Sequence, residues 1–304
     1  MASVIVIGSI NYDILSTMER APRAGETLNG ETVQLMPGGK GLNLAVAAVQ
    51  QGVPVRFVGK VGRDMFGDRI LAFFDEKGID ATHVGRSDTE ATGSALILVE
   101  ATGENRIVVI PAANKEIRPA DADGLAIAAG DLLVSQFEVP RTTIAALFAK
   151  GRAAGARTLL IAAPALDDAP ESLWADTDII VVNETELAHF AGVDLAADAA
   201  APDIAAAARR LLRRPGQTLI ATLGVRGALA VTAEAETLVP GRKVTAVDTT
   251  GAGDCFAGSL SARLAAGDDL AAAMRYANVA ASIACMRVGT STAMPVAEEV
   301  RAAL

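Results

Sequence analysis

Two carboxylates, Asp248 and Asp254, flank a loop of small residues with the sequence DTTGAGD. The apolar residues after the loop recur at helical spacing, which predicts a helix over residues 253–266 that begins at the loop. Unpaired backbone N–H groups and the helix dipole favour an anion at such a start, for example a phosphoryl group. Asp254 would lie beside that anion and could accept a proton from an attacking hydroxyl, so we predict that it is a catalytic base.

The same loop has a purely structural interpretation. Gly251 and Gly253 could make a tight turn, and Asp254 could stabilise the helix start through the dipole; on the loop alone the two interpretations stand level. Two other phosphate loops are excluded by spacing. A P-loop would need a glycine where Gln34 stands and a hydroxyl where Gly41 stands, and the first apolar run is followed by GSIN, which lacks the dinucleotide-binding glycines.

Three further polar groups are expected at carboxyl ends of strands or at helix starts, where ligands of a doubly wound sheet bind. They are Asn11 with Asp13, the segment GGKGLN at residues 38–43, and Glu138. Their donors and acceptors suit a ligand with several vicinal hydroxyls. Each group, taken alone, also fits ordinary turn chemistry or helix entry.

Two more motifs follow later strands. Asn183 and Glu186 are three residues apart, as on one face of a helix start, and their oxygens suit Mg²⁺ beside phosphates. Helix capping explains the same pair equally well. The segment TLGVRG at residues 222–227 ends a strand in a glycine turn, which fits the edge of a nucleotide site or a simple turn.

These residues need a scaffold. Short β-branched runs alternate with alanine-rich helical stretches, which predicts a parallel sheet covered by helices on both faces. Buried strands are expected at residues 4–8, 55–58, 132–135, 158–161, 179–182 and 218–223. Helices are expected at residues 41–51, 66–77, 142–154, 201–213, 253–266 and 270–285.

Two segments break this rhythm, at about residues 11–37 and 91–110. The second alternates apolar and polar residues on both sides of Thr102, which indicates a hairpin. Together the segments predict a small β lid inserted in a single α/β domain that spans residues 1–304. Such a lid can exclude water from a group-transfer site.

The composition of the chain argues against several classes of protein. The chain has 304 residues, 51% of them hydrophobic, and can bury a large core; its formal net charge of -9 argues against a nucleic-acid or membrane partner. The two cysteines, Cys255 and Cys285, exclude a disulfide scaffold and suit the cytoplasm. With only His83 and His189, a zinc site or a Ser-His-Asp triad is not expected. The apolar run at residues 4–7 is too short for a signal peptide or a membrane span.

Taken together, these motifs resemble the ribokinase-like, or PfkB, family of carbohydrate kinases over nearly the whole chain. The segment 38–43, with Gly52 and Gly62 after it, is similar to the first family signature, and the segment 248–258 is similar to the second. The segments 62–67 and 183–186 fit the family as well. The resemblance implies a three-layer, doubly wound, mainly parallel α/β fold with a β lid. It also implies ATP as donor and transfer of its γ-phosphoryl group to a sugar hydroxymethyl oxygen.

The resemblance further implies a role for each matching residue. Asp254 matches the base, and Gly251, Ala252 and Gly253 match the anion hole. The positions that match sugar-binding residues are Asn11, Asp13, Gly39, Lys40, Asn43, Glu138 and Asp254. The positions that match nucleotide-binding residues are Asn183, Thr222, Gly224, Gly227, Gly253 and Asn278, with Glu186 near Mg²⁺. An activating monovalent cation, K⁺, would be held by Asp248, Thr250, Ala284, Arg287 and Gly289.

Within the family, the first strand, the segment 38–43 and Glu138 favour D-ribose as substrate and ribose 5-phosphate as product. The alternatives are a nucleoside kinase, in which Tyr12 and Leu44 would help to accommodate the base, another sugar kinase of the family, and a sugar-binding regulatory protein without catalysis. A homodimer through the lids is implied by the family alone.

Four departures from the family pattern bear on the pocket. Tyr12 and Leu44 replace residues that are commonly small or polar, and either could reshape the sugar pocket. The segment IAAP at residues 161–164 lacks a polar side chain near the site. Ala293 stands where a hydroxyl often faces the cation, which would weaken dependence on K⁺.

Overall fold

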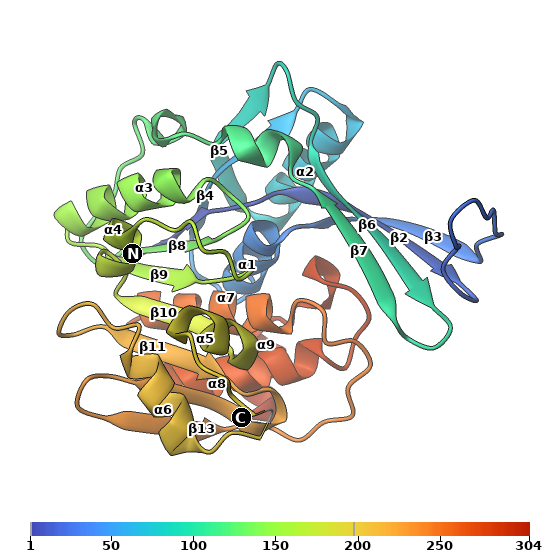
Figure 1. Cartoon of the computed structure of the whole chain (residues 1–304). Helices are drawn as coiled ribbons and strands as arrows, with labels where there is room; N and C mark the ends of the chain where they lie inside the picture. The colour runs from blue at the N-terminus through green and yellow to red at the C-terminus, as the bar shows by residue number, and fades with distance from the viewer. Residues whose placement is uncertain (1, 197) are drawn as a thin grey trace.

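A sheet of nine strands forms the middle layer of the computed structural model, which describes residues 2–196 and 198–304 (Figure 1). Its strand order is β13-β12-β11-β10-β9-β8-β1-β4-β5. The strands are β1 Val4–Ile7, β4 Val55–Gly62, β5 Ile79–Ser87, β8 Leu132–Gln136, β9 Arg157–Ile161, β10 Ile179–Asn183, β11 Thr218–Thr222, β12 Gly227–Val231 and β13 Glu236–Pro240. All neighbours pair in parallel except β11 with β12 and β12 with β13.

Alternation along the strands divides the core into two halves. In β1, Val4 and Val6 pack into one apolar cluster, while Ile5 and Ile7 pack into the other. The first cluster is covered by α1 Lys40–Val49, α2 Met65–Lys77, α7 Ala252–Ala265, α8 Leu270–Ala284 and α9 Ala297–Ala303. The second is covered by α3 Arg141–Ala153, α4 Glu171–Ala175, α5 Glu184–Ala191 and α6 Ala201–Arg209. The predicted three-layer fold is therefore confirmed.

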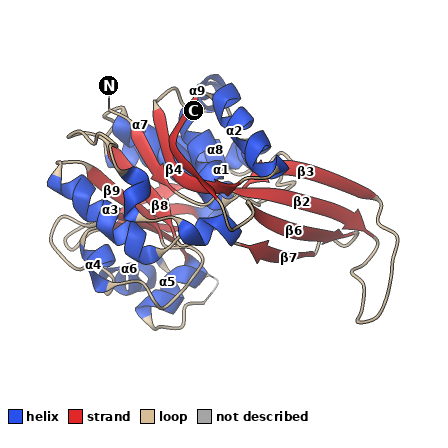
Figure 2. Ribbon diagram, turned by 90° about the horizontal axis from the view of Figure 1, so that it is seen from above, coloured by secondary structure: helices blue, strands red, loops and turns tan. Residues whose placement is uncertain are grey.

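A second sheet of four strands projects from this body (Figure 2). It contains β2 Asn11–Met18, β3 Thr32–Gly38, β6 Gly93–Glu100 and β7 Asn105–Ile110, in the order β3-β2-β6-β7. The hairpins β2-β3 and β6-β7 are joined by parallel pairing of β2 with β6. The predicted hairpin around Thr102 is confirmed, with Gly103 in the left-handed region at φ 87°.

The strand order reverses at β1, which lies between β4 and β8. A crevice at the carboxyl end of the strands is expected at such a point. The chain leaves β1 there and continues into β2 after three residues, so the second sheet begins at the edge of that crevice. Four short 3-10 segments, η1 Ala112–Glu116, η2 Pro119–Ala122, η3 Gly224–Arg226 and η4 Ser291–Ala293, complete the connections described here.

Three strands were not expected from the sequence, β5, β12 and β13, and the last two make one edge of the sheet antiparallel. In the described part of the chain, no helix has both the length and the apolar character of a membrane span.

Candidate active site

The loop before α7 turns through Gly251, which has φ 76° and ψ 1°. This left-handed conformation favours glycine, and it lets the chain enter the helix at Ala252 within one residue. The N–H groups of the first helical turn have no intrahelical partner. Gly251, Gly253 and Asp254 line one cavity of about 180 Å³, so this helix start faces open space that an anion can occupy.

Asp254 is buried in the first turn of α7, with 6% of its surface exposed. Its Oδ2 accepts a hydrogen bond of 2.9 Å from Asn43 Nδ2 on α1. Burial raises the pKa of the Asp254 carboxyl, whereas Lys40 and the bond from Asn43 oppose that rise. A raised pKa improves a carboxylate as a proton acceptor.

Three more carboxylates, Asp13, Glu138 and Glu186, are coupled electrostatically to Asp254 or to Lys40. Burial, followed by the charges of Glu138 and Asp254, raises the pKa of Asp13 to about 7. The pKa of Lys40 is raised, first by the charge of Asp254 and then, against the effect of burial, by Glu138 and Glu186. The structure therefore brings together the predicted base and three predicted sugar-binding residues in one electrostatically coupled group.

Glycines let the segment before α1 approach β2 closely. A Cβ atom on Gly38 would lie 2.0 Å from Asp13 Oδ2, and one on Gly39 would lie 2.9 Å from the backbone nitrogen of Asn11. Gly39 also has φ 91°. The glycine pair therefore makes room for the Asp13 carboxyl at the start of the second sheet.

Ser9, between β1 and β2, connects the segment after β8 with the start of α1. Its hydroxyl donates to Glu138 Oε2 at 2.6 Å and accepts from Gln136 Nε2 at 2.9 Å and from the backbone N–H of Gly41 at 3.2 Å. The backbone N–H of Lys40 points to the same Glu138 oxygen at 3.3 Å. Glu138 is thus oriented by the predicted residue Lys40 and by Ser9, which was not predicted from the sequence as a site residue.

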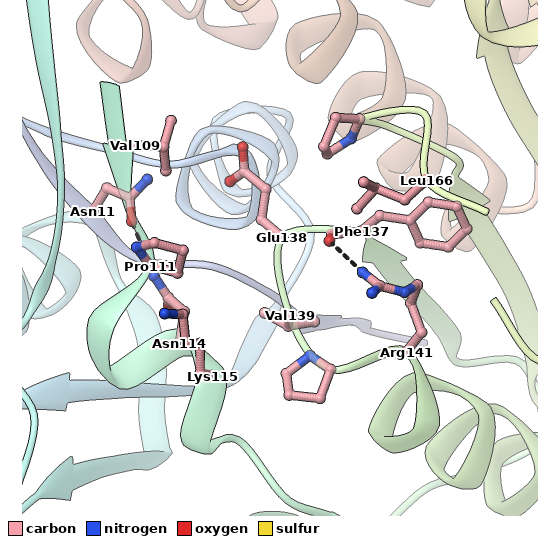
Figure 3. Close-up of a pocket in the computed structure, with 12 residues that line it drawn as sticks. Asn11, Val109, Pro111, Asn114, Lys115, Phe137, Glu138, Val139, Arg141 and Leu166 are labelled. Carbon is pink, nitrogen blue, oxygen red and sulfur yellow. Dashed lines mark hydrogen bonds between the residues drawn. The ribbon is translucent and has the colours of Figure 1, made fainter. Parts of the chain in front are cut away.

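A larger cavity, of about 380 Å³, opens beside Asn11 and Glu138 (Figure 3). Asn114, which was not predicted, lines it and contacts Asn11 through Nδ2, 2.9 Å from Asn11 Oδ1. The remaining wall includes Phe137, and Arg141 donates to the Phe137 carbonyl at 3.3 Å. The cavity is therefore lined by amide, carboxylate and basic side chains together with apolar ones.

A third cavity, of about 240 Å³, lies on the other side of the loop before α7. Its lining contains five of the six predicted nucleotide positions, Thr222, Gly224, Gly227, Gly253 and Asn278. Asn278 Nδ2 donates to the carbonyl of Val239 at 3.2 Å, which fixes its side chain at the rim. Gly253 lines both this cavity and the one that contains Asp254. The two spaces therefore meet at the helix start.

The pair Asn183 and Glu186 forms a reciprocal cap at the start of α5. Asn183 Oδ1 accepts from the Glu186 N–H, and Glu186 Oε2 accepts from the Asn183 N–H, both at 2.8 Å. The capping interpretation is correct, and both residues also line the cavity of Lys40 and Asp254. Burial raises the pKa of Glu186. Glu186 is the one acid of this pair, and its Oε1, which the cap does not use, is the carboxylate oxygen that the pair could offer to Mg²⁺.

The predicted cation positions belong to two loops that Asp248 joins. Asp248 Oδ1 accepts from the Thr250 N–H at 2.9 Å, and its Oδ2 accepts from the Gly289 N–H at 3.1 Å. The Ala284 carbonyl accepts from the Arg287 N–H at 3.0 Å. Asp248 thus holds the loop before α7 against the segment after α8.

One buried oxygen in this region lacks a partner. Thr290 Oγ1 has no hydrogen bond within the described residues, and Thr290 packs beside Gly251, where an added Cβ would lie 3.5 Å away. The Arg287 guanidinium pairs with Glu299, and Ala293 is buried without a side-chain oxygen. Thr290 therefore has a buried hydroxyl oxygen without a partner in the described residues, whereas position 293 has no side-chain oxygen.

Tyr12 and Leu44 do not shape the pocket, contrary to the expectation from the sequence. Tyr12 stacks on Phe66 with ring centroids 4.5 Å apart, and its hydroxyl accepts from Arg69 at 3.3 Å. Leu44 is fully buried in the core. Because side chains alternate along β2, Tyr12 points away from the face that carries Asn11 and Asp13. Ile161, in contrast, lines the cavity of Asp254.

Comparison with known proteins agrees with this geometry. A sequence model of the pfkB family carbohydrate kinases matches residues 1–297. The chain is 36% identical over 301 residues to a ribokinase of Staphylococcus aureus (98% of each chain). It is 35% identical over 298 residues to a deoxyribokinase of Salmonella typhi (97% of this chain, 96% of the relative).

Solved structures show the same fold. The ribokinase of Thermotoga maritima superposes with a TM-score of 0.88 at 30% identity, covering 99% of both chains. The Arabidopsis thaliana ribokinase, solved in complex with ribose and ATP, superposes with a TM-score of 0.87 at 26% identity, covering 99% of this chain and 98% of that one. The chain therefore belongs to the pfkB family of carbohydrate kinases and is a phosphotransferase with an alcohol group as acceptor.

Proposed function

We propose that the protein transfers the γ-phosphoryl group of ATP to the hydroxymethyl oxygen of D-ribose, giving ribose 5-phosphate and ADP. The observation that carries the proposal is the position of Asp254. It lies in the first turn of α7, at the junction of the cavity of predicted nucleotide residues with the cluster of Asp13, Lys40 and Glu138. A sugar held by that cluster can present a hydroxyl to Asp254 while phosphates occupy the helix start.

The chemistry follows from these positions. Asp254 takes the proton of the hydroxymethyl group as its oxygen bonds to the γ-phosphorus, and the electron pair of the breaking P–O bond leaves with ADP. Lys40 and the bond from Asn43 favour the ionised form of Asp254, against the effect of its burial. The N–H groups of the Gly251–Gly253 turn stabilise charge on the transferring group. Glu186 would hold Mg²⁺, which when bound supplies positive charge beside the phosphates.

The polar cluster suits an unsubstituted pentose. Asn11, Asp13, Asn43 and Glu138 offer donors and acceptors to several hydroxyls from three different elements. The packing of Tyr12 and Leu44 in the core argues against a nucleoside kinase, because these are the two residues that would accommodate the base. 2-Deoxy-D-ribose is the competing acceptor, because one of the relatives is a deoxyribokinase.

The test is ADP release from ATP in the presence of D-ribose, 2-deoxy-D-ribose, D-fructose or adenosine. We expect the highest kcat/KM with D-ribose. A higher value with another acceptor would reject ribose as substrate, and ATP consumption with none of them would favour a sugar-binding protein without catalysis.

Asp254→Asn tests the base. It should lower kcat by about 10²–10⁴-fold and leave ATP binding unchanged, because general-base catalysis contributes that much. Asp203→Asn, at an exposed acid in the first turn of α6, is the matched control and should keep wild-type turnover. Wild-type kcat in the Asp254 variant would disprove the assignment.

Two further properties belong to this proposal. K⁺ would bind between the loops that Asp248 joins, with Thr290 Oγ1 as an available oxygen, so ribose turnover should rise when K⁺ replaces a bulky organic cation. Two copies would pair through their lid sheets, since all six residues of β7 are exposed and Val108 is 59% exposed. Light scattering measures that stoichiometry. The free thiols of Cys255 and Cys285 suit the proposed cytoplasmic location.

A further inference from the structure

Asn114 lines the cavity of about 380 Å³ beside Asn11 and Glu138 and is 1% exposed. It belongs to η1, whose first residue, Ala112, is a non-glycine residue in the left-handed region at φ 43°. Such a conformation costs on the order of 1 kcal/mol or more and persists where the surroundings enforce it. The backbone N–H of Ala113 donates to the carbonyl of Ala91 at 3.0 Å, which anchors the turn that presents Asn114.

The backbone fixes which way the Asn114 amide points. Its Oδ1 accepts from the N–H of Ile10 at 2.9 Å, and its Nδ2 donates to the carbonyl of Ile10 at 3.0 Å. A backbone N–H can only donate and a carbonyl can only accept, so the oxygen and nitrogen of Asn114 cannot exchange places without losing both bonds. The second hydrogen of Asn114 Nδ2 is then directed to Asn11, whose Oδ1 accepts it at 2.9 Å.

This contact decides what Asn11 offers to the cavity. Because its oxygen is held by Asn114, its amide nitrogen is turned to the open space (Figure 3). Within the described residues no hydrogen bond is donated by Asn11 Nδ2, and this nitrogen is not among the fully buried atoms that lack a partner. The fit is tight, since a Cβ atom on Gly93 would lie 2.3 Å from Asn114 Nδ2 and 2.4 Å from Asn11 Oδ1.

We propose that Asn114 is a positioning residue that makes Asn11 a hydrogen-bond donor to the acceptor sugar, and so selects a sugar with an oxygen at that point. The inference rests on the proposed function for the identity of the ligand. Asn114 itself need not touch the sugar. A sugar that lacks the hydroxyl opposite Asn11 leaves a buried donor without a partner, and such a loss discriminates strongly between otherwise similar substrates.

Asn114→Asp reverses the arrangement at constant volume. The oxygen that replaces Nδ2 can donate neither to the Ile10 carbonyl nor to Asn11 Oδ1, so the Asn11 amide turns to donate to it and presents its own oxygen to the cavity. We expect KM for the sugar to rise about 10-fold or more, with KM for ATP within about 2-fold of wild type. Gly93→Ala displaces the same contact from another element and should give the same pattern; it decides the question if Asn114→Asp does not fold.

A double-mutant cycle separates this role from a structural one. In an Asn11→Ala background, where no amide remains to be oriented, Asn114→Asp should change the sugar KM by less than about 2-fold. Asn29→Ala, at an exposed asparagine in the loop between β2 and β3, is the control and should match wild type. Equal effects of Asn114→Asp in both backgrounds would overturn the proposal, as would an unchanged sugar KM in both Asn114→Asp and Gly93→Ala.

The sugar used is the best acceptor of the wild-type enzyme in the panel above. If that sugar is not D-ribose, the proposed substrate fails while the cycle still tests Asn114. If no sugar is phosphorylated, the same variants are compared by calorimetric titration with D-ribose, with Kd read in place of KM.

Discussion

Asp13→Asn should stabilise the protein at neutral and alkaline pH, although it removes a residue of the proposed sugar site. Asp13 is 5% exposed. Its burial, followed by the charges of Glu138 and Asp254, raises the pKa of its carboxyl from 3.8 to about 7. An amide has nearly the same shape and carries no charge. The variant therefore removes the repulsion and the cost of desolvating a carboxylate, while the packing against Gly38 is kept.

The magnitude follows from the shift in pKa. Each pKa unit corresponds to 1.36 kcal/mol, so ionised Asp13 lowers the free energy of unfolding by on the order of 4 kcal/mol. The folded pKa is the higher one. The contribution of protonated Asp13 to stability is therefore full below pH 3.8 and is lost as the pH rises through about 7. Wild type and variant should be equally stable near pH 4 and should diverge until about pH 7.

Urea denaturation of both proteins without ligand, at several pH values between about 4 and about 9, measures the difference. Asp75→Asn, at an exposed acid on α2, controls for the general effect of removing one negative charge. Kinase activity should fall in the Asp13 variant because the sugar loses an acceptor. If Asp13→Asn is no more stable than wild type above pH 7, the carboxyl is not held in the unfavourable environment described above.

Two further predictions concern the scaffold. Gly258→Ala should lower the free energy of unfolding by about 1–3 kcal/mol, because its Cβ would lie 2.5 Å from the Leu44 carbonyl where α7 packs on α1; an unchanged urea midpoint would mean that the helices separate at no cost. Asn183→Ala should lower it by about 1 kcal/mol through loss of the cap on α5, and the loss should persist without nucleotide, which distinguishes capping from a ligand contact in thermal unfolding.

Much of the body could be predicted from local pattern. β1 and β8 are short strands that are buried along their whole length, and the apolar runs in them are typical of a parallel sheet. β12 has the sequence GALAV, in which small residues give no clear strand signal; its pairing depends on Gly227, where an added Cβ would lie 2.1 Å from the Val239 carbonyl. β5 was missed because polar residues interrupt it.

The residues of the candidate site also fall into those that the sequence could predict and those that it could not. The loop of Asp254 and its helix could be predicted because they are contiguous in sequence. Asn114 could not be, since its partner lies 103 residues away and only the fold brings the two together. The orientation of Tyr12 could have been deduced, because residues 11 and 13 of a strand share one face and residue 12 takes the other.

The second sheet carries Asn11 and Asp13, whereas Asp254 belongs to the helical layer of the body. A sugar that contacts both is a bridge between two parts of the molecule. Its binding energy is then linked to their relative placement, because a ligand favours the arrangement in which all of its contacts are made. Any change that holds the second sheet in that arrangement should tighten sugar binding. Because such coupling is reciprocal, bound sugar should in turn hold the second sheet in place.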